Sequence, residues 1–305
     1  MTQKVLVVGA TGRQGDAVVD HLLSGVHGDF AVTAMTRHPY SARRDVASLK
    51  DRGVRVVKGD LDDPSSYREH LERVDAAFLV TTPTDGGADT EATRGRGFVD
   101  AAADAELEYL VYGSAMGTNR VEASEVEALS GKQRVETYLE ESGLDYTVIR
   151  PGLFVQNFEA QREDIEDGVL AWPVEEETLL AVVDVDDVGT VAATAFAHPD
   201  AYAGVHLDLA GDVLTLSEIA EGFAEIRGHE VTAEQVTDDR ERERFGELAA
   251  ELYAWYDDHG GFRLDAAPLA DLGVQPRSLH GALVHGDWAT PEPAGVDDEG
   301  AAIND

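Results

Sequence analysis

A short apolar run near the start of the chain, residues 5–8, leads directly into three glycines with the spacing Gly-x-x-Gly-x-x-Gly. Glycine is needed where a chain leaves a buried strand and turns sharply into a helix, and where the backbone approaches a pyrophosphate without an intervening Cβ. The free amides and the positive dipole end of the following helix also attract phosphate. The segment therefore predicts a dinucleotide-binding turn, with a purely structural turn as the alternative. The residues expected to contact the cofactor are Gly9, Thr11, Gly12, Arg13, Gln14 and Gly15.

Short apolar runs alternate with amphipathic stretches through the first half of the chain. Most of these runs are continuously apolar, as expected for parallel strands that helices cover on both faces. The alternation predicts an α/β protein with a doubly wound parallel sheet, the Rossmann fold. The expected strands are 5–8, 31–35, 54–57, 76–80, 109–112 and 146–149, and the expected helices are 13–25, 41–52, 64–73, 89–105 and 124–142.

The regular alternation ends at Arg150-Pro151-Gly152. We expect residues 1–150 to form an NADP-binding Rossmann domain and residues 151–288 to form a smaller C-terminal α/β substrate lobe, interleaved with the last strands of the sheet. Residues 289–305 are rich in Pro, Gly and acids, which predicts a disordered acidic tail. Within the lobe, the expected strands are 178–183 and 205–209, and the expected helices are 184–197, 217–227 and 238–257.

The charge balance is strongly acidic, with 60 Asp and Glu against 24 Lys and Arg and a net charge of −36. Such an excess pushes a compact state apart unless salt screens it, and the Debye length falls to about 3 Å at 1 M salt. Only four of the basic residues are Lys. The composition indicates a halophilic protein, with an ordinary acidic enzyme as the alternative. It argues against direct nucleic-acid binding, which requires a basic surface.

The absence of cysteine excludes disulfides, thiolate zinc sites and cysteine nucleophiles. The histidines are scattered, and the nearest pair, His280 and His285, has no recognisable metal-site spacing, so no metal is expected. No apolar run approaches the roughly 20 residues of a membrane span. The first expected strand begins too early for a signal peptide. We therefore expect a soluble cytoplasmic protein.

The residues after the second expected strand bear on the choice of dinucleotide. An acid at this place binds the ribose 2′-hydroxyl of NAD, whereas a basic residue accommodates the 2′-phosphate of NADP. The sequence here is Thr36-Arg37-His38, with no carboxylate. Arg37 and Arg13 together are expected to clamp a phosphate. NADP(H) is therefore the expected cofactor.

Two further strand ends belong to the same edge of the expected sheet. Asp60 and Leu61 follow the third strand, where the carboxylate can accept a hydrogen bond from the adenine amino group. Thr81, Thr82 and Pro83 follow the fourth strand, where a ribose and nicotinamide would lie. Both segments are also typical of ordinary turns, which is the alternative.

With these residues in view, the chain resembles the NmrA-like family, atypical members of the short-chain dehydrogenase/reductase superfamily, over about residues 3–288. The resemblance implies a Rossmann fold with a small C-terminal lobe, and NADP(H) bound through the glycine loop and Arg37. The family includes NADPH-dependent quinone reductases, and redox sensors that bind the dinucleotide and control a partner protein. The matching segments are 9–15, 36–39, 59–63, 131–132 and 141–152.

Ordinary short-chain reductases carry Tyr-x-x-x-Lys, in which the Lys holds the nicotinamide ribose and the Tyr acts as general acid. Here Lys132 is present, but Ala128 occupies the position of the Tyr. This disfavours an epimerase or an ordinary alcohol dehydrogenase. The family's reductases are similar in lacking the Tyr. Hydride transfer to quinone-like acceptors therefore remains open.

Lys132 shares one helical stripe with Leu129, Val135 and Leu139, which places it on the face that packs against the sheet. A charge on that face needs a polar partner. A cofactor ribose would provide one, and we expect Lys132 to bind the cofactor and take part in catalysis. A Lys that extends its amine to solvent is the alternative. Ser114, Tyr112 and Ser130 are the other candidate proton donors.

The aromatic residues Phe154, Phe158 and Trp172 follow Gly152, where a substrate is expected to enter. They are candidates for stacking on a planar acceptor, with burial in a hydrophobic core as the alternative. Two functions stay open. One is an NADPH-dependent reductase of a small quinone-like or carbonyl acceptor. The other is a catalytically silent NADP(H)-binding redox sensor that regulates a protein partner.

Overall fold

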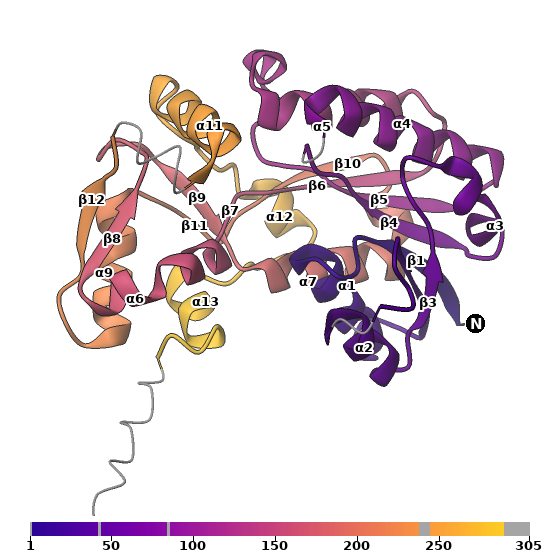
Figure 1. The fold of residues 1–305 in the computed structure, drawn as a ribbon, viewed down its shortest axis with the longest axis horizontal. Helices are drawn as coiled ribbons and strands as arrows, with labels where there is room; N and C mark the ends of the chain where they lie inside the picture. Colours follow the sequence, from indigo (N-terminus) through magenta and orange to yellow (C-terminus); the bar gives the residue numbers. More distant parts are fainter. Residues whose placement is uncertain (1, 42–43, 84–85, 238–244, 290–305) are drawn as a thin grey trace, which may run out of the picture.

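The computed structural model describes residues 2–41, 44–83, 86–237 and 245–289. Its centre is a seven-stranded sheet in the order β10-β6-β5-β4-β1-β2-β3, and every strand pairing within it is parallel (Figure 1). The predicted Rossmann fold is confirmed. The strands are β1 (Gln3–Val8), β2 (Phe30–Thr36), β3 (Arg55–Lys58), β4 (Ala76–Val80), β5 (Tyr109–Gly113), β6 (Tyr146–Pro151) and β10 (Val205–Leu209).

Helices cover both faces of this sheet (Figure 1). Successive side chains of β1 point to opposite faces of the sheet and belong to two different apolar clusters, so each face needs a cover of helices. Val5 and Val7 belong to the cluster that contains residues of α1 and α7, and Leu6 and Val8 belong to the cluster that contains residues of α4 and α5. The helices around the sheet are α1 (Arg13–Leu23), α2 (Arg44–Asp51), η1 (Pro64–Ser66), α3 (Arg68–Leu71), α4 (Gly87–Asp104), η2 (Val121–Glu125), α5 (Glu127–Glu140), α7 (Val185–Ala197) and α8 (Pro199–Tyr202).

Most of the remaining elements form the smaller lobe, on the left of Figure 1. Two small sheets, β11-β9-β7 and β12-β8, organise it. Its strands are β7 (Leu153–Phe154), β8 (Val169–Trp172), β9 (Leu180–Val183), β11 (Asp212–Leu214) and β12 (Thr232–Gln235). Its helices are η3 (Val155–Gln161), α6 (Arg162–Glu166), α9 (Leu216–Arg227), α11 (Glu247–Asp258) and α13 (Leu279–His285). The helix α12 (Ala267–Asp271) returns to the Rossmann part, where Leu269 joins the apolar cluster that contains residues of α1 and α7.

The chain passes between the two parts more than once. Although β10 and α7 follow residue 150, β10 pairs with β6, and Gly189 of α7 packs on the backbone of α1 at Ala17. The helix expected over 238–257 is described as α11, and its first residues, 238–244, lie outside the described residues. The expected tail lies outside them too, apart from residue 289.

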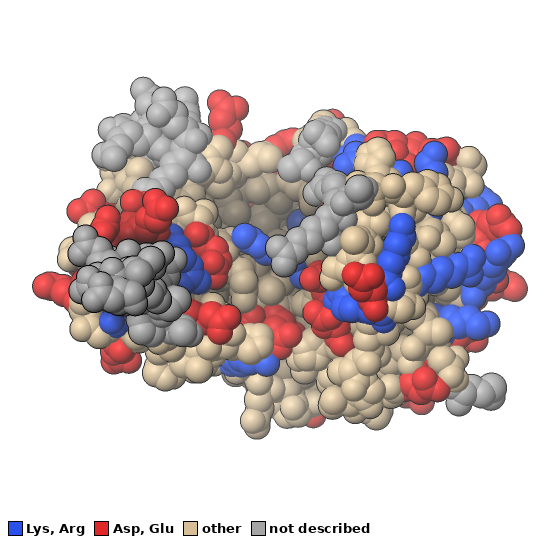
Figure 2. Space-filling model, turned by 60° about the horizontal axis from the view of Figure 1, so that its bottom comes forward, with Lys and Arg blue, Asp and Glu red and all other residues tan. Residues whose placement is uncertain are grey.

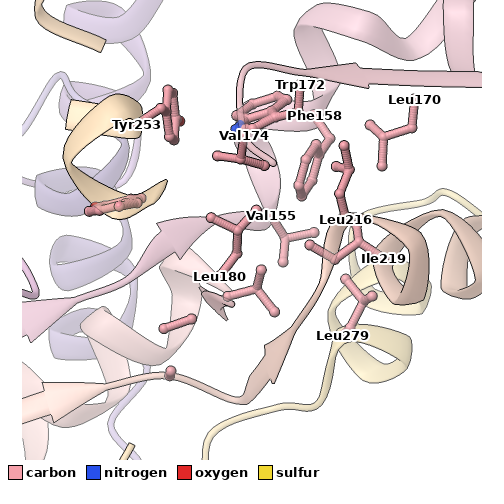
Figure 3. Packing of buried hydrophobic residues seen from close by; sticks show 14 of the residues in the cluster. Val155, Phe158, Leu170, Trp172, Val174, Leu180, Leu216, Ile219, Tyr253 and Leu279 are labelled. Atoms are coloured by element: carbon pink, nitrogen blue, oxygen red, sulfur yellow. The ribbon is translucent and has the colours of Figure 1, made fainter. Parts of the chain in front are cut away.

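The core of the lobe is rich in aromatic rings (Figure 3). Phe158 is fully buried, with its ring centroid 4.8 Å from that of Trp172 and 5.5 Å from that of Phe223. This packing fixes η3 against β8 and α9. It thereby sets the position of the segment that follows β6, which borders the Rossmann part. Across the described parts of the chain, no helix combines the length and the apolar character needed to cross a membrane.

A buried ion pair joins α5 to strand β6 of the sheet. The guanidinium of Arg150, at the end of β6, donates to both carboxylate oxygens of Glu136, with its Nη2 2.5 Å from Oε2. Ser114 and Thr118 donate their hydroxyl protons to Oε1 of the same carboxylate. Burial raises the pKa of Glu136, but the nearby His206, with its ring Nδ1 3.8 Å from Oε2, the hydrogen bonds and charge of Arg150 and the hydrogen bond of Ser114 outweigh it and lower the pKa from 4.5 to about 2.

This carboxylate gives a prediction about acid stability. Because the folded-state pKa of about 2 lies below the ordinary 4.5, the Glu136 contribution is complete above pH 4.5 and is lost as the pH falls toward 2. The shift corresponds to roughly 3 kcal/mol. Denaturant unfolding of the wild type and of Glu136→Gln should therefore show a large difference in unfolding free energy at neutral pH that shrinks through this window. A difference that stays constant with pH would contradict the assignment.

Candidate functional site

A cleft of about 530 Å³ opens at the carboxyl ends of β1, β2, β3 and β4. This is where parallel α/β sheets bind ligands. The space-filling view shows a hollow between the Rossmann part and the lobe, and Lys and Arg gather mainly on the Rossmann side of this face (Figure 2). Twelve of the residues predicted from the sequence line the cleft: Gly9, Thr11, Gly12, Arg13, Gln14, Gly15, Arg37, Asp60, Leu61, Thr81, Thr82 and Phe154.

The turn between β1 and α1 forms the floor of the cleft. Gly9 has φ +74°, in the left-handed region that favours glycine, and its carbonyl accepts a hydrogen bond of 2.8 Å from the amide of Gly12. A Cβ at Gly15 would lie 2.3 Å from the Gly9 carbonyl oxygen, so only glycine fits there. Gly12 is the N-cap residue of α1, and no side chain of the described residues caps this helix. Its first amides therefore remain available to an anion.

Arg37 and Arg94 line the cleft beside the loops that follow β2 and β3. Arg94, on α4, donates two parallel hydrogen bonds of 2.7 Å to the Asp62 carboxylate, from Nε to Oδ1 and from Nη2 to Oδ2. These hydrogen bonds, with a smaller effect of the Arg37 charge, lower the pKa of Asp62. Sequence reasoning missed Arg94. The available signal was an arginine on the helix after the fourth strand, in a chain with few basic residues.

Two other predicted polar residues at the cleft, Arg13 and Asp60, make hydrogen bonds within the protein. Arg13 donates from Nη1 to Oδ1 of Asn157, at 2.7 Å, which ties α1 to η3 of the lobe. The Asp60 carboxylate accepts the amide of Asp62 at 3.1 Å, as the turn interpretation expects. Pro83 is half-buried and is not among the residues that line the cleft.

Lys132 packs toward the sheet, as its helical stripe predicts. It is buried, and its Nζ donates to the Thr81 carbonyl oxygen at 2.5 Å and to Oε1 of Glu91 at 2.9 Å. Lys132 does not line the cleft but binds Thr81, which does. Glu91, on α4, was missed from the sequence. A Cβ at position 131 would lie 2.6 Å from Oε2 of Glu91, which explains why a glycine precedes Lys132.

The alternative proton donors lie away from the walls of the cleft. The Ser114 hydroxyl is buried and donates to Glu136 in the polar network described above. The hydroxyl of Tyr112 is 2.9 Å from Oγ1 of Thr81, and burial raises the pKa of this Tyr well above its usual value. Ser130 lines a separate hollow between α4 and α5.

The two predicted substrate residues separate in the structure. Phe154 lines the cleft, whereas Phe158 lies in the core of the lobe with Trp172. The expectation that Phe158 and Trp172 face a substrate is therefore corrected. Their rings pack against each other because η3 turns inward after Phe154. Among the described residues, no group of His, Asp and Glu is arranged to hold a metal ion.

Comparison with known proteins identifies a family and several structures that are similar to this chain. The model of the NmrA-like family matches residues 1–272. An NmrA-like family domain-containing protein of Dictyostelium discoideum is 26% identical over 283 residues, which cover 87% of this chain and 90% of that protein. The structure is similar to that of the NADPH-dependent quinone oxidoreductase of Escherichia coli complexed with NADPH, with a TM-score of 0.77, 21% identity and coverage of 92% of this chain and 99% of that one.

A second solved structure with the same fold is that of NmrA, a negative transcriptional regulator, in complex with NADP. It has a TM-score of 0.71 and 20% identity, and the match covers 93% of this chain and 90% of that one. At such identities the two structures show a shared fold. The family match, in contrast, extends over nearly the whole chain. The chain therefore belongs to the NmrA-like family.

Proposed function

We propose that this protein binds NADP(H) in the cleft and reduces a small quinone-like or carbonyl acceptor. One observation carries the proposal: the uncapped start of α1, the glycine turn and Arg37 all border the same cleft. In a chain with a net charge of −36, a cleft with these cationic and amide donors is suited to an anionic ligand. The solved quinone oxidoreductase and NmrA structures, which contain NADPH and NADP, support this choice.

The residues of the cleft fit a dinucleotide. At Gly15 the backbone of α1 approaches Gly9 so closely that there is no room for a Cβ. Because no side chain projects here, a pyrophosphate can approach the backbone directly. The side-chain oxygen of Gln14 is buried and has no hydrogen-bond partner among the described residues. Arg37 follows β2, the position from which an arginine accommodates the 2′-phosphate of NADP in dinucleotide-binding folds, and Arg94 lines the same cleft. These features favour NADP(H) over NAD(H).

The other end of the cleft, at the end of β4, is where the acceptor would bind. NADPH, when bound, supplies the hydride, and the acceptor takes up one further proton. Phe154 and Val80 provide apolar surface for a planar acceptor. Lys132 acts from behind this wall, where its ammonium holds the carbonyl of Thr81 in place.

A redox sensor that binds NADP(H) without turnover is the second candidate function. Ala128 replaces the usual Tyr, and the buried hydroxyls of Ser114 and Tyr112 are already hydrogen-bonded within the protein. These observations favour binding without chemistry. A sensor would regulate a protein partner, and the solved structure of NmrA, a negative transcriptional regulator in complex with NADP, supports a regulatory role.

The decisive test is NADPH oxidation against a panel of quinones, in multimolar KCl because the acidic composition is typical of halophilic proteins. We expect turnover with at least one quinone, and we expect it to fall by about 10²-fold in Lys132→Met because Thr81 loses its support. Tight NADPH binding without turnover on any acceptor would favour the sensor. Failure to bind either NADPH or NADP⁺ would contradict both functions.

A second prediction concerns cofactor choice. Arg37→Gln should weaken NADPH binding about 10- to 100-fold, which is the value of charge-assisted hydrogen bonds to a phosphate. NADH affinity should hardly change, because NADH carries no 2′-phosphate. Calorimetric titration of both nucleotides measures this, and Arg55→Gln is the control, because Arg55 is an exposed residue of β3 that does not line the cleft. Equal losses for NADPH and NADH would show that Arg37 does not read the phosphate.

A further inference from the structure

Glu91 places a carboxylate inside the protein, behind the wall of the cleft. Its side chain is fully buried, on α4 where this helix packs against α5. Oε1 accepts hydrogen bonds from Nζ of Lys132 and from Oγ1 of Thr81, both at 2.9 Å. Because Lys132 also donates to the Thr81 carbonyl oxygen at 2.5 Å, the three residues form a closed polar unit.

This unit fixes Thr81 at two points. Lys132 holds its carbonyl oxygen, and Glu91 holds its hydroxyl. Tyr112 adds a third contact, with its hydroxyl 2.9 Å from Oγ1 of Thr81. Thr81 directly follows β4 and lines the cleft, so the unit sets the position of the cleft wall at the acceptor end.

The buried Glu91 carboxylate requires features that do not favour stability. A Cβ at position 131 would lie 2.6 Å from Oε2 of Glu91 and 2.9 Å from the carbonyl oxygen of Ala88, so α5 carries a glycine there, within a helix that glycine weakens. Oε2 has no hydrogen-bond partner among the described residues. A buried ion pair is seldom more stabilising than apolar residues of the same volume. Stability alone therefore gives little reason for Glu91.

We propose that Glu91 is a positioning residue, which holds the Lys132 ammonium against the Thr81 carbonyl at the acceptor end of the cofactor cleft. This inference rests on the proposed binding of NADP(H). Removal of the Glu91 charge leaves Lys132 as an unpaired buried cation, which will move toward water and release Thr81. The glycine turn and Arg37 lie on other elements of the cleft, so the affinity for NADPH is set mainly there.

The test uses three variants of the full chain. Glu91→Gln breaks the pair and strands a buried charge, so both the unfolding midpoint and kcat should fall. Glu91→Gln combined with Lys132→Met removes both charges and should recover the unfolding midpoint. If the pair positions Thr81, this double variant will still have a kcat lowered by about tenfold or more, whereas KM for NADPH changes less. Glu91→Asp keeps the charge and should retain more activity than Glu91→Gln.

A second readout does not depend on turnover. The fluorescence of bound NADPH reports the surroundings of the nicotinamide, and the double variant should bind NADPH with altered emission. Asp89→Asn is the matched control, because it breaks another α4–α5 ion pair, between Asp89 and Arg134 at 2.8 Å, whose Asp is 94% exposed. This control should leave kcat and emission unchanged.

The outcomes separate the two proposals. A double variant with wild-type emission and wild-type turnover would overturn the role of Glu91 and leave the reductase intact. A wild-type protein that binds NADPH but never turns over would overturn the reductase, and the emission of the variants would then decide on Glu91. A wild-type protein that binds no NADPH would overturn both.

Discussion

The structure depends on one close backbone approach, between Gly15 of α1 and the carbonyl of Gly9, where a Cβ would stand only 2.3 Å from the oxygen. This contact sets the angle at which α1 leaves β1, and it exposes the first amides of the helix to the cleft. The same helix packs against α7, where a Cβ at Gly189 would lie 2.5 Å from the Ala17 carbonyl oxygen. It also carries Arg13 to its hydrogen bond with Asn157. The same turn therefore forms the floor of the cleft and positions the helix that contacts the lobe.

Some of the many acidic residues of the chain pair with individual basic side chains at and near the cleft. At and behind the cleft, two cations each have a dedicated carboxylate: Arg94 pairs with Asp62, and the buried Lys132 pairs with Glu91. Arg150, on β6, has the same kind of partner in Glu136. A buried cation without such a partner is strongly unfavourable. The carboxylates therefore allow basic groups to be held at fixed positions near the site, while the exposed acids are left to interact with salt and water.

What could be predicted from the sequence depended on short-range rules. The glycine turn follows from backbone sterics over a few residues, and the inward face of Lys132 follows from helical periodicity. Glu91 and Arg94 could not be found in this way, because their partners lie 41 and 32 residues away and meet them only after α4 has packed. Phe158 shows another limit. An aromatic residue after a strand suits a binding wall and a core equally well, and only the inward turn of η3 decides for the core.

The most direct measurement is hydrogen–deuterium exchange of the full chain with and without NADPH, in multimolar KCl. Binding in the cleft should slow the exchange of the amides in residues 9–15, 36–37 and 59–61, which border it. The amides of α9, in the core of the lobe, should not change. Slower exchange confined to other regions, or no change with saturating NADPH, would contradict the placement of the dinucleotide at the glycine turn.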